Sequence, residues 1–195
     1  MIEVEKKFLI NPSDVTRLLS GAEFVSETKN VDIYWDTPDY SLTTKDLWLR
    51  SRNGKFELKI PMHGGEGRVF DQYEELDSDK QIADKLNLPP GVLQDELSKA
   101  NYRPFAELHT LRKKYKKGGF VVDVDELDFG YNIVEVEMLV NDKSEIDGAI
   151  KKILSFADDH NLKISQVRRK VAEYLKRNDA KHYKALVDVG VVNDD

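Results

Sequence analysis

Short segments in which charged and apolar residues alternate recur along this chain, and they restrict its fold more than any other feature. The N-terminal segment reads I-E-V-E-K-K-F, and residues 120–125 and 133–140 read F-V-V-D-V-D and I-V-E-V-E-M-L-V. Alternate side chains of an extended strand share a face, so each segment predicts a β-strand with one apolar face and one charged face. Successive charges on such a face lie about 7 Å apart.

A first hairpin is predicted where two further alternating segments meet. An Asn-Gly pair at 53–54 joins L-W-L-R-S-R to K-F-E-L-K-I. Asn-Gly between strands is the strongest local hairpin signal. A two-residue turn there places Arg50 opposite Glu57 and Trp48 opposite Lys59.

A second hairpin is predicted at the Gly-Gly pair 118–119, which joins L-R-K-K-Y-K-K to F-V-V-D-V-D. A two-residue turn there places Arg112 opposite Asp125 and Lys114 opposite Asp123. Acidic and basic strands therefore interleave.

Helices and one more strand complete the expected elements. N-V-D-I-Y-W-D-T at 30–37 predicts a strand. Apolar spacing and capping residues predict helical stretches at residues 11–19, 77–97, 144–159 and 165–186. The second stretch is broken by Pro-Pro-Gly at 89–91, and Ser144 with Asp147 forms the predicted capping box of the third.

The composition narrows the kinds of metal site that the chain is expected to form. The 195 residues carry a formal net charge of −6 and include no cysteine. Without cysteine, any metal must be held by oxygen or histidine ligands, which favours hard cations such as Mg²⁺. None of the four histidines has a neighbour at metal-ligand spacing, so we assign them no role.

The sequence lacks the patterns of secreted, membrane and nucleic-acid-binding chains. The N-terminus carries no signal-peptide pattern, and no segment approaches the roughly 20 apolar residues of a membrane span. A negative net charge is a poor match for nucleic acid. We therefore expect a cytoplasmic monomer with a small-molecule ligand, no nucleic-acid partner and no membrane.

The charged strand faces are open to two explanations. An antiparallel sheet with its charged face in water is the ordinary one, and it needs no function. Such a sheet gains nothing from neighbouring charges of one sign, which are mildly destabilising. Same-sign pairs nevertheless occur at Glu3 and Glu5, Asp123 and Asp125, and Glu135 and Glu137.

A curled sheet accounts for these pairs. Lys170 falls among Val167, Val171 and Tyr174 on the expected inward face of the last helix, where an ammonium needs anions nearby. We therefore predict an α+β fold, an antiparallel β-barrel with a charged interior that forms a tunnel, flanked by helices. Carboxylates inside would hold magnesium, and Arg and Lys would hold a polyanion.

A series of short motifs runs in a fixed order along most of the chain. E-V-E-K at the N-terminus fits the pattern Glu-x-Glu-x-Lys, and it is followed by Y-W-D-T, L-W-L-R-S-R, F-E-L-K, Q-Y-E-E-L, D-V-D-E-L-D-F-G-Y, E-V-E and finally Lys170. The series resembles the CYTH superfamily, the triphosphate tunnel metalloenzymes. One such motif is weak evidence, but this order is specific. The resemblance implies a single catalytic domain over residues 1–190 and a short tail at 191–195.

The resemblance also implies roles for the charged positions. The implied ligands of Mg²⁺ are Glu3, Glu5, Asp123, Glu135 and Glu137. The residues implied to grip the triphosphate and support catalysis are Lys7, Arg50, Arg52, Lys59, Arg112 and Lys170, with Glu135 also at the substrate.

Aromatic and acidic positions complete the implied site. Trp48 would stack on a cationic heterocycle at the tunnel mouth, although a packed core tryptophan is the alternative. Tyr34 would act there or at a phosphate. Glu75 matches an acid of the family, whereas Glu74 stands where a basic residue is expected. Asp125 is not expected to be a ligand, because the hairpin register gives it an arginine partner.

The implied reaction follows from the finer motifs. L-W-L-R-S-R, and D-F-G-Y ahead of E-V-E, look most like family members that hydrolyse thiamine triphosphate. This implies a thiamine-triphosphatase-like hydrolase that removes the terminal phosphate to give thiamine diphosphate and phosphate. A relative acting on inorganic tripolyphosphate or nucleoside triphosphates is the alternative. A non-catalytic module that binds phosphorylated ligands and an adenylate cyclase are further alternatives.

Overall fold

The strands pair in one closed barrel in the order β1-β5-β4-β3-β2-β6-β7-β8. The structure, a computed structural model, describes residues 2–62, 71–165 and 167–193. The pairs β1–β8, β2–β3, β3–β4, β6–β7 and β7–β8 are antiparallel. The predicted fold class, an antiparallel barrel with helices, is confirmed.

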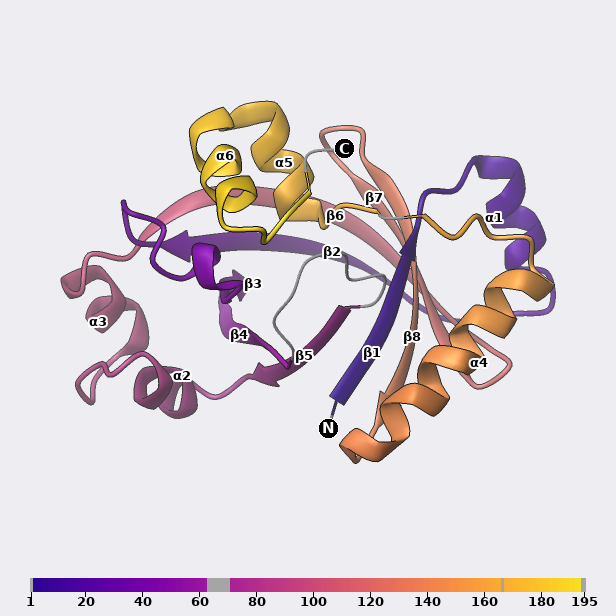
Figure 1. Cartoon of the computed structure of the whole chain (residues 1–195), viewed down its shortest axis with the longest axis horizontal. Helices are drawn as coiled ribbons and strands as arrows, with labels where there is room; N and C mark the ends of the chain where they lie inside the picture. Colours follow the sequence, from indigo (N-terminus) through magenta and orange to yellow (C-terminus); the bar gives the residue numbers. More distant parts are fainter. Residues whose placement is uncertain (1, 63–70, 166, 194–195) are drawn as a thin grey trace. The chain divides into compact units, whose positions relative to one another are not determined.

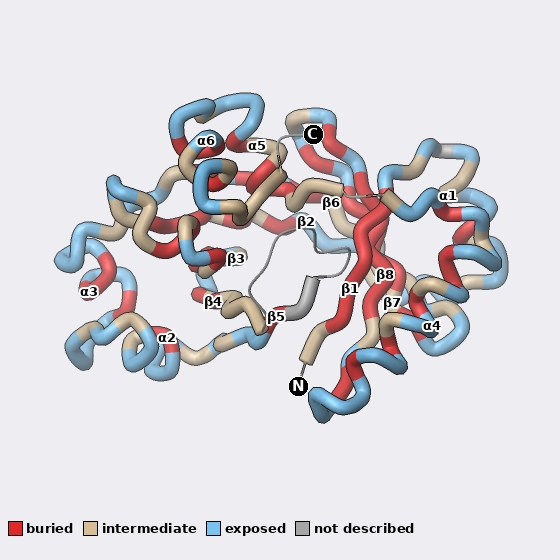
Figure 2. Tube along the Cα trace, viewed as in Figure 1, coloured by how far each residue is buried: buried red, intermediate tan, exposed pale blue. Residues whose placement is uncertain are grey.

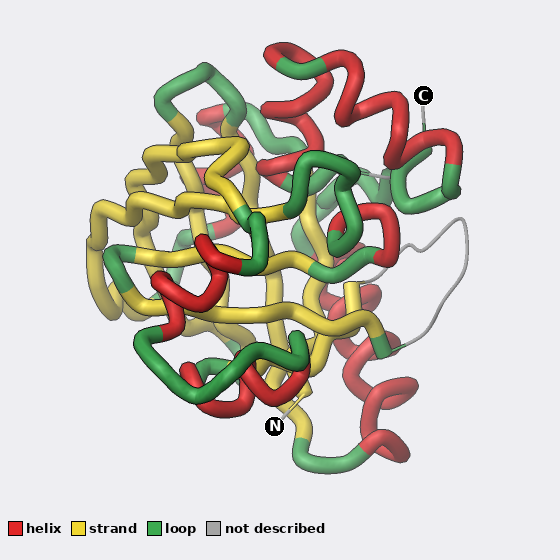
Figure 3. The backbone as a smooth tube through the Cα atoms, turned by 90° about the vertical axis from the view of Figure 1, so that its left-hand side faces the viewer, coloured by secondary structure: helices red, strands yellow, loops and turns green. Residues whose placement is uncertain are grey.

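The elements alternate unevenly along the chain (Figure 1). The strands are β1 (Ile2–Phe8), β2 (Glu23–Asp36), β3 (Trp48–Arg52), β4 (Lys55–Pro61), β5 (Asp71–Leu76), β6 (Arg103–Lys117), β7 (Phe120–Leu127) and β8 (Asn132–Val140). The helices are α1 (Pro12–Leu18), α2 (Asp79–Lys85), α3 (Leu93–Lys99), α4 (Ile146–Asp159), α5 (Lys170–Asn178) and α6 (Ala180–Asp188), with short 3-10 turns η1 (Thr43–Lys45) and η2 (Lys143–Glu145). In Figure 3 the strand segments run beside one another and are joined by turns.

Both predicted hairpins are confirmed. Asn53 and Gly54 have φ of 51° and 87°, and Gly118 and Gly119 have φ of 57° and 85°. Positive φ at both central residues is what a tight type I′ turn requires, and asparagine and glycine tolerate it best. The observed registers place the residue pairs as predicted at both hairpins.

The chain divides into two compact units, which we describe separately. Unit 1 comprises Met1–Lys29, Arg68–Tyr73 and Thr110–Arg168, and unit 2 comprises Asn30–Gly67, Glu74–His109 and Arg169–Asp195. Strands β2, β5 and β6 contribute residues to both units.

Unit 1 buries the apolar faces of its strands beneath α4. Helix α4 runs along β1 and β8 in Figure 1 and contacts both strands. Val4, Val136 and Ile153 are completely buried there, and the ring of Phe156 on α4 lies 4.6 Å from that of Phe120 on β7. Figure 2 shows β1 and β8 buried along most of their length, while α4 exposes one side. The apolar residues of the alternating pattern are thus used by this helix.

Unit 2 has its own apolar cluster beneath α2 and α3. Its buried members are Trp35, Leu42, Leu49, Phe56, Leu58, Ile82, Leu93 and Leu97. Helix α2 contacts β4 and α3, and α6 contacts α5 and η1. The two helices predicted on either side of Pro-Pro-Gly are confirmed as α2 and α3.

The predicted start of α4 is wrong. The capping box is formed by Asp142 and Glu145, whose side chains accept hydrogen bonds from backbone N–H groups, and it precedes η2. The α-helix itself begins only at Ile146. Asp142 competes successfully with Ser144 because a carboxylate is a stronger acceptor at a helix N-terminus.

The single C-terminal helix predicted over 165–186 is also wrong. Ser165 and residues 167–169 are not helical, and Gln166 lies outside the described residues. Helix α5 ends at Asn178, and Asp179 has extended φ of −140° and caps α6 by accepting a hydrogen bond from the N–H of His182 at 3.0 Å. Asp prefers this capping role to a place in a helix interior, which breaks the helix.

Two further boundaries differ from expectation. Strand β2 begins at Glu23, seven residues before the predicted strand at 30–37. Of the predicted tail 191–195, the last two residues lie outside the described residues. Of the helices in the described part of the chain, none has both the length and the apolar character needed to cross a membrane.

Candidate active site

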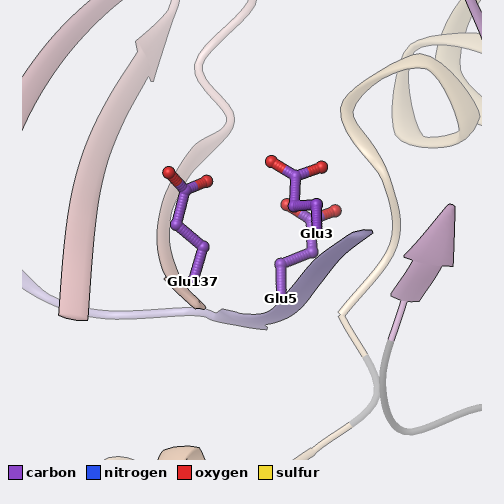
Figure 4. Close-up of side chains that lie close together, drawn as sticks. All are labelled: Glu3, Glu5 and Glu137. Carbon is purple, nitrogen blue, oxygen red and sulfur yellow. The ribbon is translucent and has the colours of Figure 1, made fainter. Parts of the chain in front are cut away.

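Three carboxylates gather on the paired strands β1 and β8 of unit 1. The antiparallel register sets Glu5 opposite Glu137, and Glu3 lies two residues before Glu5 on the same face. One oxygen of each side chain lies within 4.8 Å of the other two. Figure 4 shows all three side chains standing on the same side of the strand pair. We call this group the carboxylate cluster.

The pKa of Glu137 is raised to about 8. Burial is the largest cause, and the negative charges of Glu3 and Asp123 add to it, while the positive charge of Lys114 opposes it. The Glu137 side chain also shares a hydrogen bond with Glu3. A proton between the two therefore relieves their repulsion at neutral pH.

The carboxylate cluster fits a hard divalent cation. Its donors are carboxylate oxygens alone, which are the ligands that Mg²⁺ and Ca²⁺ prefer. A cation would offset the same negative charges that raise the pKa of Glu137. Of the five predicted metal ligands, the structure brings these three together.

The other two predicted ligands, Asp123 and Glu135, contact Arg112. The Arg112 Nε and Nη2 donate to the two oxygens of Asp125 at 2.7 and 2.6 Å, as the hairpin register predicted. The same guanidinium contacts Asp123 and Glu135. Burial lowers the pKa of Arg112, but the charges of Glu135, Asp125 and Asp123 outweigh burial and raise that pKa well above its ordinary value.

Lys114 is a cation at this site that the predicted residue set lacks. Its Nζ lies 3.0 Å from Asp123 and 3.4 Å from Glu137. Burial raises the pKa of Asp123, although Arg112 and Lys114 oppose that rise. The predicted pairing of Lys114 with Asp123 was the signal for its presence, and the structure confirms that pairing.

Lys7, the lysine of the Glu-x-Glu-x-Lys pattern, joins the carboxylates of β1 and β8. It forms an ion pair with Glu5, and its Nζ lies 3.9 Å from Glu135. The preceding lysine, Lys6, instead donates to the carbonyl oxygen of Ser165 at 2.7 Å. The alternation of a strand thus assigns the two lysines to different faces.

In unit 2, the two arginines of β3 bind carboxylates. Arg50 donates to Glu57 at 2.9 and 2.7 Å, and Arg52 donates to both oxygens of Asp32 at 2.7 and 2.8 Å. Burial lowers the pKa of Arg50, but the negative charges around it, including Asp32 and Glu57, raise that pKa overall. Burial raises the pKa of Asp32, yet the bond from Arg52 and the charge of Arg50 lower it overall.

Asp32 is a second residue that the predicted site lacks. It is 1% exposed, and from β2 it lies opposite Arg52 on the neighbouring strand β3. The signal was its position two residues before Tyr34, which puts both on one strand face. Lys170 is buried, as expected from its inward face, and its charge also lowers the pKa of Asp32.

Lys59 pairs with Glu75 in unit 2, with 2.6 Å between Nζ and Oε1. Glu75, which was matched to an acid of the family, is thus the ion-pair partner of Lys59. Glu74, where a basic residue was expected, is exposed.

Trp48 is buried, and its ring is covered by an arginine. Its indole Nε1 donates to Asp46 at 2.8 Å, and Arg169 Nη1 lies 2.6 Å from the same carboxylate oxygen. The Arg169 guanidinium carbon lies 5.4 Å from the centre of the Trp48 ring. The sequence reasoning missed Asp46 and Arg169, because a left-handed Asp46 with φ of 62° follows from no local motif.

Tyr34, the other predicted aromatic, is also buried. Its ring lies 6.1 Å from that of Phe105, and its hydroxyl group influences the pKa of Arg50. The structure therefore places Tyr34 beside one of the predicted phosphate-binding residues.

One histidine occupies a specific buried position, although none was assigned a role. His182 is 0% exposed, its Nε2 lies 2.7 Å from the hydroxyl of Thr43, and its ring stacks on Tyr40 at 3.9 Å. Burial lowers its pKa, against the charges of Asp36 and Asp179. His63 lies outside the described residues.

Comparisons with known proteins show which proteins this chain resembles in sequence and in fold. The chain is 32% identical to human thiamine-triphosphatase over 97% of its own length and 90% of the human protein, and 31% identical to the thiamine-triphosphatase of Macaca fascicularis with the same coverage. The fold is similar to that of the PH1819 protein from Pyrococcus horikoshii OT3, with a TM-score of 0.68 and 22% identity over 90% of this chain and 99% of that one.

A family comparison covers all of the strands that carry the charged residues. Residues 1–170 match the CYTH domain family. That range begins with the strand of Glu3 and Glu5 and ends at Lys170, so it contains every predicted site residue. The chain belongs to the CYTH domain family.

Proposed function

We propose that this protein hydrolyses the terminal phosphate of thiamine triphosphate, giving thiamine diphosphate and phosphate, with Mg²⁺ as its metal. The relatives named thiamine-triphosphatase support a hydrolase acting on a triphosphate. We further propose that residues 1–190 act as one catalytic domain and that the protein is a cytoplasmic monomer.

The carboxylate cluster is the observation that carries this proposal. Three acidic side chains within 4.8 Å of one another, with one pKa raised to about 8, form an arrangement that a divalent cation would stabilise. We assign Glu3, Glu5 and Glu137 to the metal, together with Asp123 and Glu135 once Arg112 binds phosphate. A bound divalent cation would supply a Lewis acid that withdraws charge from the phosphate oxygens.

The basic residues would bind and stabilise the phosphates. Phosphoryl transfer needs mainly positioning and neutralisation of charge from the protein. We assign this role to Lys7, Arg50, Arg52, Lys59, Arg112 and Lys170. Arg52 and Arg112 each bind both oxygens of a carboxylate, and Arg50 donates two N–H groups to one oxygen of Glu57, so all three are preorganised to donate to phosphate oxygens.

Aromatic residues in unit 2 would recognise the organic part of the substrate. We assign Trp48 to the thiamine rings and Tyr34 to the rings or to a phosphate, since an indole face attracts a cationic heterocycle. Lys114 is added to the phosphate-binding residues because it lies among the same carboxylates as Arg112.

Hydrolysis of inorganic tripolyphosphate is the second candidate. The observation in its favour is the burial of Trp48, which is 3% exposed and lies beneath Arg169. A tryptophan covered in this way has no open face for a substrate ring. A solved structure of a Hippeastrum protein, 15% identical with a TM-score of 0.57, is described as an adenylyl cyclase candidate that reveals a dominant triphosphatase activity.

Phosphate release from several triphosphates tests the proposal. Thiamine triphosphate, inorganic tripolyphosphate and ATP are compared, each with Mg²⁺, Mn²⁺, Ca²⁺ or a chelator. We expect the highest kcat/KM for thiamine triphosphate with Mg²⁺ and no turnover with the chelator. A higher kcat/KM for tripolyphosphate selects the second candidate, and cyclic AMP from ATP would reveal a cyclase.

A further inference from the structure

Asp46, Trp48 and Arg169 form a compact arrangement in unit 2. The Oδ1 of Asp46 accepts a hydrogen bond from the Trp48 indole Nε1 at 2.8 Å. The same oxygen forms an ion pair with Nη1 of Arg169 at 2.6 Å. The Arg169 guanidinium lies over the Trp48 ring. Asp46 is 5% and Trp48 is 3% exposed, so both are held in a dry environment.

An aromatic face beside a buried carboxylate is the chemistry that binds an organic cation. The ring attracts positive charge through its quadrupole, and a carboxylate in a dry site adds a strong ionic attraction. In this structure the cation at that place is the guanidinium of Arg169. The thiazolium ring of thiamine is also a flat cation, and it would be attracted to the same ring face and the same carboxylate through its charge, without donating a hydrogen bond.

We propose that Arg169 occupies, as an internal competitor, the place on Trp48 and Asp46 that the cationic ring of the substrate would take. The inference rests on the proposed function, because it requires a triphosphate that carries an organic cation. Arg169 is then a specificity-determining residue. An incoming ring must displace its guanidinium, whereas inorganic tripolyphosphate has no group that needs this place.

The position of Arg169 in the chain suits such a displacement. It precedes the first residue of α5 and has an extended backbone, with φ of −64° and ψ of 151°. Its side chain is 18% exposed, so it has a route toward solvent. The helix does not depend on this side chain for a capping hydrogen bond.

The alternative is that the Asp46–Arg169 pair only fastens α5 to the turn before β3. A fastening pair would affect stability and all substrates alike. An internal competitor affects the preference between a cationic and an inorganic substrate. The ratio of two kcat/KM values therefore separates these explanations, because a general loss of folded protein cancels from it.

The test compares Arg169→Gln, Arg169→Lys and Asp46→Asn with the parent. The measured quantity is kcat/KM for thiamine triphosphate divided by that for tripolyphosphate. Arg169→Gln is expected to raise this preference about fivefold, because a competing cation–π contact is removed. Asp46→Asn is expected to lower it by a similar factor, and Arg169→Lys, which retains a cation, should stay near the parent. Arg177→Gln is the control, since Arg177 is an α5 arginine paired with Glu173.

A binding measurement keeps the inference distinguishable from the proposed function. Calorimetry gives the Kd of thiamine diphosphate and of inorganic pyrophosphate for each protein, whether or not any triphosphate is hydrolysed. Tighter thiamine diphosphate binding in Arg169→Gln, with pyrophosphate unchanged, supports the internal competitor even if the proposed reaction fails. If Arg169→Gln changes neither the ratio of the two kcat/KM values nor the ratio of the two Kd values, the proposal that Arg169 is an internal competitor is wrong. The result for Arg169→Gln decides by itself if Asp46→Asn fails to fold.

Discussion

Units 1 and 2 use the same alternating pattern for two different electrostatic arrangements. In unit 1, carboxylate oxygens of Glu3, Glu5 and Glu137 lie within 4.8 Å of one another, and the pKa of Glu137 is raised to about 8. In unit 2, the two arginines of β3 each bind a carboxylate of a neighbouring strand. The first arrangement has excess negative charge, and the second is balanced within the fold.

The difference separates two meanings of alternating charge. Opposite charges that face each other across strands neutralise each other and need no ligand. Like charges that face each other are tolerated only when a proton or a cation lies between them. Same-sign pairs across neighbouring strands are therefore the stronger indication of a metal site.

The largest expected effect comes from removing a charge of the carboxylate cluster. Glu137→Gln keeps the shape of the side chain but removes an anionic ligand, so we expect at least about a 1,000-fold loss of kcat at saturating Mg²⁺, as with a chelator. The matched control is Glu126→Gln, which removes an exposed carboxylate of β7 that pairs with Lys113. Undiminished turnover by Glu137→Gln would falsify its role as a ligand.

The balanced arrangement of unit 2 is tested by Asp32→Asn. This change leaves the buried Arg50 and the half-buried Arg52 without their shared carboxylate, so the free energy of unfolding should fall by about 3 kcal/mol. Asp77→Asn is the control, because Asp77 pairs with Lys55 where both side chains are more than half exposed. That pair should contribute less than about 1 kcal/mol. Urea denaturation measures the free energy of unfolding of both variants. Similar losses in the two would mean that the buried pairs of Asp32 stabilise unit 2 no more than an exposed pair does.

The pH dependence of the metal-free protein sharpens the contrast from the other side. The pKa of Glu137 is about 8 in the folded state and near 4.5 in the unfolded state, so the folded protein binds the extra proton. Its contribution to stability is complete below pH 4.5 and is lost as the pH rises toward 8. Stability should thus decline over this window by on the order of a few kcal/mol, and Glu137→Gln should remove that decline.

The double variant Glu3→Gln, Glu5→Gln tests the same repulsion without a change of pH. Without metal it should melt at or above the temperature of the parent, because like-charge repulsion is relieved. With a non-hydrolysable triphosphate and Mg²⁺ at 100 times the Kd of the parent, the free energy of unfolding of the parent should rise by about 2.7 kcal/mol. At the same ligand concentration, that of the variant should rise by less. An equal gain in both proteins would show that these carboxylates face only water.

The smallest expected effect concerns His182 of unit 2. Burial holds its pKa below the ordinary 6.5, despite Asp36 and Asp179, and its other neighbours Thr43 and Tyr40 are uncharged. The unfolded chain therefore binds more protons, and stability should fall as the pH drops below 6.5. His182→Phe should flatten that part of the curve, and an unchanged slope would assign it to other groups.

Much of the barrel could be predicted from local rules. The turns at 53–54 and 118–119 fix the registers of β3–β4 and β6–β7, so Arg50–Glu57 and Arg112–Asp125 follow from the sequence alone. The pairing of Glu5 with Glu137 could not be predicted in this way, because β1 and β8 lie at opposite ends of the chain. Only closure of the barrel brings them together.

The misses have physical reasons as well. Asp179 ends one helix and starts the next, and the apolar spacing on both sides hides that break. Asp46 adopts a left-handed backbone that residues other than glycine adopt rarely, so its approach to Trp48 has no sequence signature. Arg169 lies outside the motifs and is brought to Asp46 by tertiary packing.

The tight turns of the two hairpins restrict how the length of this chain can vary during evolution. One residue added within β7 would shift the remaining side chains to opposite faces, exchanging Asp123 and Asp125 with their valine neighbours. Such a single insertion would place apolar side chains on the charged face of the strand, and it would place carboxylates on the apolar face beneath α4. Descendants of this chain should therefore differ in length in the connections outside the hairpins, while β3–β4 and β6–β7 keep their residue counts.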